Sequence, residues 1–209
     1  METVTLPEGR WINAPARSEV SDSCVTFTTE PGTDFWQRTY YGFQNNNAPA
    51  YVWDVDRNLT FSCSIRFDYH VLFDQAGVVV WIDENNWIKA SVEYDNDVFS
   101  RLGVVVTNNG YSDWSTRNCE SRGYISLRIS QRGPDFLIEA NEGGDWEQLR
   151  ICHLAVLGET TLGMGKQKAG DLPAAPVAMG VYACSPGESS CDVEFDNLSF
   201  SEPIWEMHR

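Results

Sequence analysis

Cysteines and basic residues are scarce in the 209-residue sequence, and long apolar runs are absent. The six cysteines form no C-x-x-C pair, which argues against structural zinc, and they are too sparse for a disulfide scaffold. No stretch approaches the ~20 apolar residues of a membrane span, and the opening METVTLPEGRW does not read as a signal peptide. We therefore expect a cytoplasmic protein with free thiols.

Lys and Arg total 15 residues against 30 Asp and Glu, so the formal net charge is −15. Phosphate contacts need clustered Lys and Arg, and an anionic membrane attracts basic segments. We therefore expect neither a nucleic-acid partner nor a membrane partner. Glycosylation sequons at Asn58 and Asn197 leave secretion open as an alternative.

Helical patterning is also missing, because no apolar i, i+3, i+4, i+7 pattern persists through three turns. Instead, apolar and polar residues alternate in short segments such as 61–67 and 124–130, and Gly-rich or Pro-rich turns separate such segments. About a dozen such strands predict an all-β fold in which two antiparallel sheets are stacked. The length suits a single domain over residues 1–209.

The stretch 74–116 organises the rest, because apolar patterning and polar chemistry alternate along the same strands. In each of the segments 76–83 and 87–94, every second side chain points toward a core, and the side chains between them point to the opposite face. Both apolar sets reach the same core only if the connecting turn has an odd number of residues. We predict a three-residue loop, Glu84 to Asn86, with a left-handed Asn, which sets Asp83 opposite Trp87 and Trp81 opposite Lys89.

The face away from the core is then polar and aromatic. Lys89 and Glu93 lie ~13 Å apart along the strand, so we expect them to meet only through an intermediate group. Trp81 and Trp87 need a cover, which a loop, a partner or a ligand could supply. The aromatic loop at 32–41 is either an anchor under the sheet edge or part of a binding rim.

Signatures of known catalytic and metal sites are absent. There is no two-His-plus-carboxylate spacing and no Gly-x-Ser-x-Gly elbow, so we predict no metal and no cofactor. The run Asp95-Asn96-Asp97 offers oxygen ligands for calcium, but such a run is far more often a hairpin turn. The catalytic candidates are Glu93, Lys89 and Asp74.

Several segments carry a family resemblance. In chain order they are Asp34-Phe-Trp-Gln-Arg-Thr, DQAGVVVWIDENNWIKA at 74–90, Glu93-Tyr, Val104-Val-Val-Thr, Ser112-Asp-Trp-Ser and Ala183-Cys-Ser-Pro. Together they resemble the regulation-of-enolase family over nearly the whole chain. The resemblance implies a concanavalin A-like jelly-roll sandwich of two antiparallel sheets, one concave, and it implies no general activity. The Glu-x-Asp-x-x-Glu strand of retaining glucanases with this fold is missing here.

Two functional hypotheses follow. The preferred one is a non-catalytic, regulatory protein that binds a carbohydrate-like small molecule or a protein partner, such as a metabolic enzyme, in the concave groove. The alternative is a glycan- or metabolite-directed enzyme in the same groove, with Glu93 or Asp74 as general base and Lys89 as electrostatic stabiliser. The predicted ligand-binding residues are Trp36, Arg38, Tyr41, Gln75, Trp81, Trp87, Lys89, Glu93 and Trp114.

Overall fold

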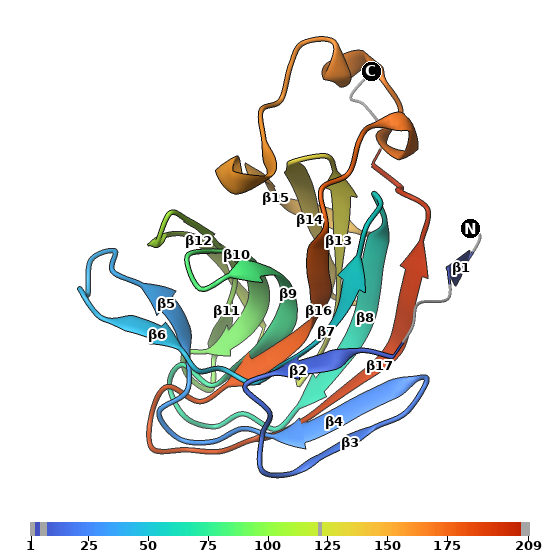
Figure 1. Ribbon diagram of the computed structural model, residues 1–209. Helices are drawn as coiled ribbons and strands as arrows, with labels where there is room; N and C mark the ends of the chain where they lie inside the picture. Colours follow the sequence, from blue (N-terminus) through green and yellow to red (C-terminus); the bar gives the residue numbers. More distant parts are fainter. Residues whose placement is uncertain (1–2, 5–7, 121–122, 206–209) are drawn as a thin grey trace.

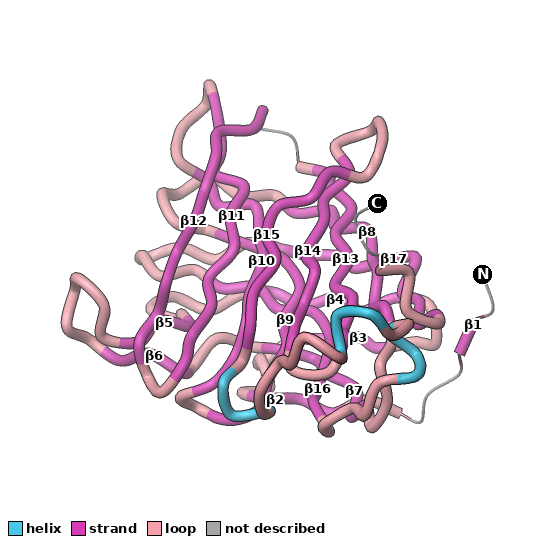
Figure 2. The backbone as a smooth tube through the Cα atoms, turned by 90° about the horizontal axis from the view of Figure 1, so that it is seen from above, coloured by secondary structure: helices cyan, strands magenta, loops and turns pink. Residues whose placement is uncertain are grey.

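The computed structural model describes residues 3–4, 8–120 and 123–205. Two large antiparallel sheets stack face to face (Figure 1), and the view from above shows them as two layers of strands (Figure 2). The prediction of an all-β jelly-roll sandwich with one concave sheet is confirmed. Among the described residues, no helix is long and apolar enough to cross a membrane.

The eight-stranded sheet has the order β15-β14-β13-β8-β17-β4-β3, with β1 paired to β17. Its strands are β1 (Thr3–Val4), β3 (Ser18–Val20), β4 (Cys24–Thr28), β8 (Thr60–Phe67), β13 (Tyr124–Arg132), β14 (Asp135–Asn141), β15 (Glu147–His153) and β17 (Asp192–Ser201).

The seven-stranded sheet has the order β12-β11-β10-β9-β16-β7-β2, and β5 pairs with β6 in a separate hairpin. Its strands are β2 (Arg10–Ile12), β7 (Ala50–Val55), β9 (Gln75–Asp83), β10 (Asn86–Tyr94), β11 (Phe99–Asn108), β12 (Tyr111–Glu120) and β16 (Val177–Cys184). The hairpin consists of β5 (Phe35–Gln37) and β6 (Gln44–Asn46).

The main core lies between the two sheets and is built from the alternate apolar residues of their strands. Phe61, Leu127, Ile129, Phe136 and Phe195 are among its fully buried side chains. Burying each such side chain stabilises the fold by roughly 1.5–3 kcal/mol. The inward faces predicted for segments 61–67 and 124–130 are both confirmed.

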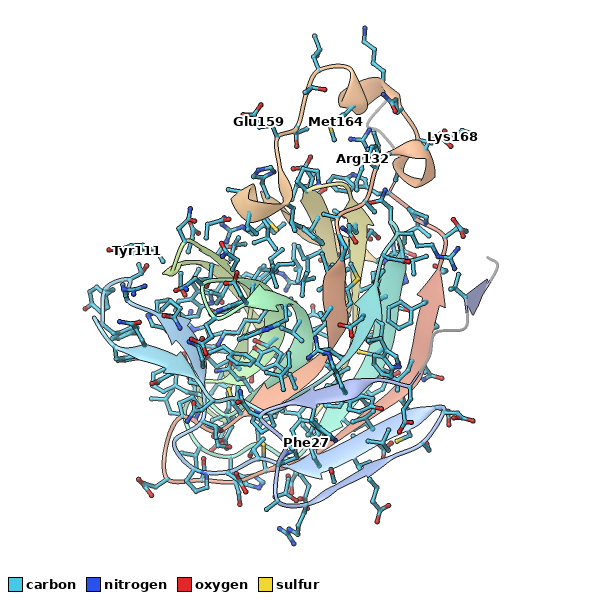
Figure 3. The ribbon with its side chains drawn as sticks, viewed as in Figure 1. Phe27, Tyr111, Arg132, Glu159, Met164 and Lys168 are labelled. Carbon is cyan, nitrogen blue, oxygen red and sulfur yellow. The ribbon has the colours of Figure 1, made fainter. Side chains whose placement is uncertain are left out.

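Residues 154–176 cross from β15 in one sheet to β16 in the other. They contain three short 3₁₀ helices, η1 (Ala155–Leu157), η2 (Met164–Lys166) and η3 (Ala169–Asp171). Figure 3 shows Arg132 beneath this segment, and its guanidinium donates to Gln167 O at 2.8 Å. The Asn58 amide donates to Ala169 O and Leu172 O at 2.9 and 2.8 Å. The crossing is therefore fastened to the sandwich by hydrogen bonds to its carbonyls.

This fastening bears on the two sequons. Asn58 is 4% exposed, and all its amide hydrogen bonds are to the backbone, so the folded protein offers no room for a glycan there. Asn197, in contrast, is exposed. Only the second sequon is accessible in the folded chain.

The predicted hairpin between β9 and β10 has the correct faces but the wrong register. Asn86 pairs with Asp83, Trp87 with Trp81, and Lys89 with Val79. The pairing has a bulge between Asn86 and Trp87, and this bulge accounts for the extra residue that we placed in the loop. The turn is therefore tighter than predicted, and the apolar residues of both strands still face the core. Asp83 Oδ1 accepts from the Asn85 N–H at 2.7 Å, a local turn bond that needs no left-handed Asn.

Close approach of strands in the seven-stranded sheet depends on glycine. A Cβ on Gly77 would lie 1.8 Å from Ala90 O, and one on Gly180 would lie 2.0 Å from Tyr51 O. Both residues belong to the face that points away from the main core. A side chain at either position would therefore clash with the backbone of the neighbouring strand.

Candidate functional site

The β5–β6 hairpin stands on the outer face of β9, β10 and β11 (Figure 1) and covers part of it. Beneath the hairpin lies a second, smaller apolar cluster. Its members include Phe35, Val79, Trp87, Val105 and Tyr182. The hairpin is therefore held on the sheet by a core of its own.

A pocket of about 440 Å³ opens beside this cluster. Its floor comes from β9, β10 and β11, and its walls come from the β5–β6 hairpin, β12, Phe73 and the turn at Pro186 and Gly187. Six of the nine predicted ligand-binding residues line it: Trp36, Tyr41, Gln75, Lys89, Glu93 and Trp114. The pocket thus gathers residues from six separate parts of the sequence.

A buried ion pair belongs to the pocket lining. Lys89 Nζ lies 3.1 Å from Asp34 Oδ1, and their side chains are 5% and 13% exposed. Burial lowers the pKa of Lys89, but the charge of Asp34 and the neighbouring Cys184 and Glu93 outweigh that effect, so its pKa lies above the ordinary value. Lys89 therefore stays charged at neutral pH, and Asp34 is its counter-ion.

Gln75 connects this ion pair to Glu93. Its Oε1 accepts from Lys89 Nζ at 3.0 Å and from the Tyr182 hydroxyl at 2.8 Å. Its Nε2 donates to Phe73 O at 3.2 Å and to Glu93 Oε2 at 3.1 Å. The prediction that Lys89 and Glu93 meet only through an intermediate is confirmed. Because all four hydrogen-bonding positions of the amide are used, Gln75 orients its neighbours.

Glu93 has an unusual protonation equilibrium. Burial raises its pKa to about 7, and Asp34 and Asp95 act in the same direction, against the opposing charges of Lys89 and Arg101. The carboxyl group is therefore protonated in about half of the molecules near neutral pH. It can serve as a hydrogen-bond donor or as an acceptor.

Aromatic side chains form the walls. Trp36 Nε1 donates to Thr39 O at 2.9 Å, and the Trp36 and Tyr41 rings meet edge to face with centroids 5.6 Å apart. Across the pocket, Trp114 is 42% exposed and lies against Gly103, where a Cβ would come within 2.8 Å of its Nε1. The absence of a side chain at Gly103 is what lets the Trp114 ring lie on the sheet.

Three predicted ligand-binding residues lie elsewhere. Trp87 is fully buried and packs against Phe35 with ring centroids 5.7 Å apart, and Trp81 packs against the same ring at 5.2 Å. Of the covers we considered for these two tryptophans, the structure selects the loop. Arg38 donates to Gly110 O at 2.8 Å and lies over the Tyr111 ring, which Figure 3 labels near the hairpin tip.

Asp74, one of the candidate bases, does not line the pocket. Its carboxylate is fully buried and accepts hydrogen bonds from Ser189 Oγ at 2.6 Å and from the backbone N–H of Val71 at 3.0 Å. These contacts give it a structural role in holding two loops together. Of the candidate catalytic residues, the structure brings only Glu93 and Lys89 to the pocket.

Two charged residues of the pocket were missing from the predicted site. Asp34 comes from the aromatic loop, and no sequence pattern shows that this loop folds over Lys89. Arg101 is the β11 partner of Glu93 and donates to Asp95 Oδ2 at 2.8 Å. Its position opposite Glu93 could have been inferred had the register of β10 and β11 been predicted. Within the part of the chain that the structure describes, no group of three His, Cys, Asp or Glu side chains could hold a metal ion.

A second, larger hollow of about 760 Å³ lies on the other sheet, along β3, β4, β8 and β17. Its one arginine from β8, Arg66, is paired with both Glu194 and Asp196 on β17. These are exposed surface pairs, and such pairs contribute little free energy. We assign the candidate site to the smaller pocket because only there do buried charges and aromatic walls converge.

Comparison with known proteins places the chain in a family. Residues 11–203 match the family described as "Protein of unknown function (DUF1349)". The chain belongs to this family. It is 38% identical over 203 residues to "Regulation of enolase protein 1" of Saccharomyces cerevisiae, covering 95% of this chain and 92% of that protein. The family resemblance predicted from the sequence is confirmed.

Solved structures extend the likeness to the fold. A crystal structure of a functionally unknown protein from Saccharomyces cerevisiae matches with a TM-score of 0.79 at 26% identity, covering 95% of this chain and 98% of that one. A mutant of the GH43 protein BlXynB from Bacillus licheniformis matches at 0.68 and 14% identity, over 96% of this chain and 38% of that one. An alginate lyase from Klebsiella pneumoniae matches at 0.52 and 9% identity, over 90% and 84%. The last two show the shared fold alone.

Proposed function

We propose that this protein binds a sugar-like small molecule in the pocket beside the β5–β6 hairpin and serves as a non-catalytic regulator. The observation that carries the proposal is the meeting of the buried Asp34–Lys89 pair with exposed aromatic rings in one enclosure of about 440 Å³. That volume lies within the range of roughly 300–1,000 Å³ of small-molecule sites.

The polar floor has hydrogen-bonding capacity to spare. An ammonium group has three donors, and Lys89 gives two of them to Asp34 and Gln75. Among the described residues, Asp34 Oδ2 and Glu93 Oε1 accept no hydrogen bond from the protein. A hydroxyl group both donates and accepts, so it can satisfy a neighbouring donor and acceptor at once.

The walls suit the apolar part of the same ligand. Sugar rings present C–H faces, which pack on aromatic rings while the hydroxyl groups at the ring edge reach polar partners. Trp114 offers such a ring surface, and Tyr41 and Phe43 stack on each other on the hairpin side, with centroids 5.3 Å apart. Aromatic walls around a polar floor therefore favour a polyhydroxylated ring.

The regulatory part of the proposal rests on family membership. The yeast relative is named for regulation of enolase, so a metabolic enzyme is the protein partner we propose for this chain. Ligand binding in the pocket would then report metabolite levels to that partner. A cytoplasmic location agrees with this role and stays a prediction.

One observation favours the enzymatic alternative. The pKa of about 7 at Glu93 suits a group that takes up and releases a proton at neutral pH. The second carboxylate of the pocket, Asp34, is neutralised by Lys89, which leaves Glu93 as the proton-transfer group of such an enzyme. If Glu93→Gln abolished a turnover that the unmodified protein shows, the non-catalytic proposal would be wrong.

Titration calorimetry with a panel of monosaccharides and disaccharides tests the binding proposal. We expect at least one sugar to bind, Trp114→Ala to weaken its binding about tenfold or more, and Tyr111→Ala to leave it unchanged. Tyr111 is the matched control because it is an exposed aromatic residue of the same strand that does not line the pocket. No heat from any sugar, or equal binding by both variants, would contradict the proposal.

A further inference from the structure

The charges around the pocket cancel in pairs, and one carboxyl group is left over. Lys89 is paired with Asp34, and Arg101 donates to Asp95 at 2.8 Å. These are the two cationic residues in the pocket lining. Glu93 is the remaining carboxyl group of the lining, and the protein as a whole carries a formal charge of −15.

The arginine of the hairpin, Arg38, does not line the pocket. Arg38 directly follows β5 in the hairpin. Its guanidinium donates to Gly110 O, and its Cζ lies 5.6 Å from the centroid of the Tyr111 ring. Gly110 fixes this position, because a Cβ there would lie 2.1 Å from Arg38 Nη1. The arginine thus serves to join the hairpin to the β11–β12 turn.

We infer that the pocket selects an uncharged polyol of one or two sugar rings and discriminates against the phosphate ester or carboxylate form of the same sugar. The inference rests on the proposed function and adds the chemical class of the ligand. A phosphate group binds best to cations whose charge is not yet compensated, and here each cation already has a carboxylate partner. A third carboxyl group, Glu93, adds repulsion whenever it is ionised.

A hydroxyl group fits where a phosphate does not. It accepts from the third N–H of Lys89 and donates to Asp34 Oδ2, so the buried ion pair stays intact. A second hydroxyl meets Glu93 in either protonation state, because a protonated carboxyl donates and an ionised one accepts. The Asp34–Lys89 pair therefore offers one donor and one acceptor to a neutral group. The two charges of the pair cancel each other before a ligand binds.

Calorimetric titration with matched sugar pairs tests this. The probes are glucose, galactose and xylose, together with glucose 6-phosphate, galactose 1-phosphate and glucuronate, at fixed ionic strength and pH 7.5. We expect a neutral sugar to bind at least about tenfold more tightly than its charged counterpart. Tighter binding of a phosphate or uronate would overturn the inference and leave the proposed function standing. Absence of binding by every sugar, charged and neutral, would overturn both.

Two variants are used so that the test still works if one of them fails to fold. Glu93→Gln removes the unpaired carboxyl group, and Asp34→Asn leaves the charge of Lys89 uncompensated. In both variants, the ratio of the affinity for the neutral sugar to the affinity for the charged sugar should fall by about tenfold. The fall should be larger for Asp34→Asn than for Glu93→Gln. If Asp34→Asn does not fold, Glu93→Gln alone decides the matter, since its side chain lies at the more exposed end of the network. An unchanged preference in a folded variant contradicts the inference.

Discussion

The two halves of the outer face of β10 have different surroundings. At one end of β10, Trp87 is fully buried under the β5–β6 hairpin, in a cluster with Phe35. Toward the other end, Lys89 and Glu93 lie on the same face but border a pocket. The covered half behaves as a second core, whereas the open half holds buried polar groups beside a pocket. The density of aromatic residues is similar in both, so aromatic content alone does not mark the site.

The difference arises from what the hairpin contributes to each half. Over the covered half it supplies an apolar ring, Phe35, which fills the space between Trp81 and Trp87. Over the open half it supplies a carboxylate, Asp34, and the edge of the Trp36 ring. Two adjacent residues of one loop thus close one half of the face and furnish the other half with its counter-ion.

The largest expected effect comes from breaking the covered half. Trp87→Ala removes a fully buried ring from a small cluster, and we expect the free energy of unfolding to fall by about 4 kcal/mol. Urea denaturation followed by circular dichroism measures it. The same truncation at Trp114, which is half exposed, is the control. A cost below about 1 kcal/mol at Trp87 would show that the hairpin is not held by this cluster.

Breaking the ion pair should cost somewhat less. Lys89→Met leaves the Asp34 carboxylate poorly hydrated and without its counter-ion, and we expect a loss of about 3 kcal/mol. The double variant Lys89→Met with Asp34→Asn should recover much of that loss, because no buried charge is then unpaired. Thermal unfolding of the wild type, both single variants and the double variant completes the cycle. Additive losses would mean that the two charges do not interact.

Glu93 gives the open half a pH dependence. Its folded-state pKa of about 7 lies above the ordinary value of 4.5, so the folded state holds the proton more tightly than the unfolded state does. Its contribution to stability is full below pH 4.5 and is lost as the pH rises through 7, by about 3 kcal/mol in all.

The matched variant isolates this contribution. Glu93→Gln cannot titrate, so the difference in unfolding free energy between variant and wild type should grow in favour of the variant from pH 4.5 to pH 7. Denaturant titrations at closely spaced pH values measure the difference. A difference that stays constant across this range would mean that Glu93 has no raised pKa.

The smallest effect on stability belongs to the pocket wall. Trp114→Ala should change the unfolding free energy by less than about 1 kcal/mol, because the ring is 42% exposed. Replacing Gly103 by Ala should displace the ring and weaken sugar binding, with an added cost in stability, since the added Cβ would fall 2.8 Å from both Trp114 Nε1 and the backbone Ser115 O. Fluorescence of the tryptophans reports both changes. Full binding by either variant would remove Trp114 from the site.

The sequence was sufficient to predict the faces of the strands, because side-chain alternation depends only on local backbone geometry. It therefore predicted that Lys89 and Glu93 share a polar face and need an intermediate, which proves to be Gln75. The hairpin register could not be predicted, since a bulge and an odd loop satisfy the same alternation.

The sequence also could not predict which segment covers Trp81 and Trp87. It depends on contacts between β5 and strands more than forty residues away, and no local pattern encodes such a fold-back. The same fold-back brings Asp34 to Lys89. Two of the five aromatic residues predicted to bind a ligand, Trp81 and Trp87, therefore pack against the protein itself.

The claim that the open half of this face is a binding site is tested most directly by a crystal structure of the protein soaked with the tightest-binding neutral sugar. We predict electron density between Trp114 and the Asp34–Lys89 pair, with hydroxyl groups within hydrogen-bond distance of Lys89 Nζ and Asp34 Oδ2. Density confined to the hollow along β3, β4, β8 and β17, with the pocket beside the hairpin unchanged, would contradict the account.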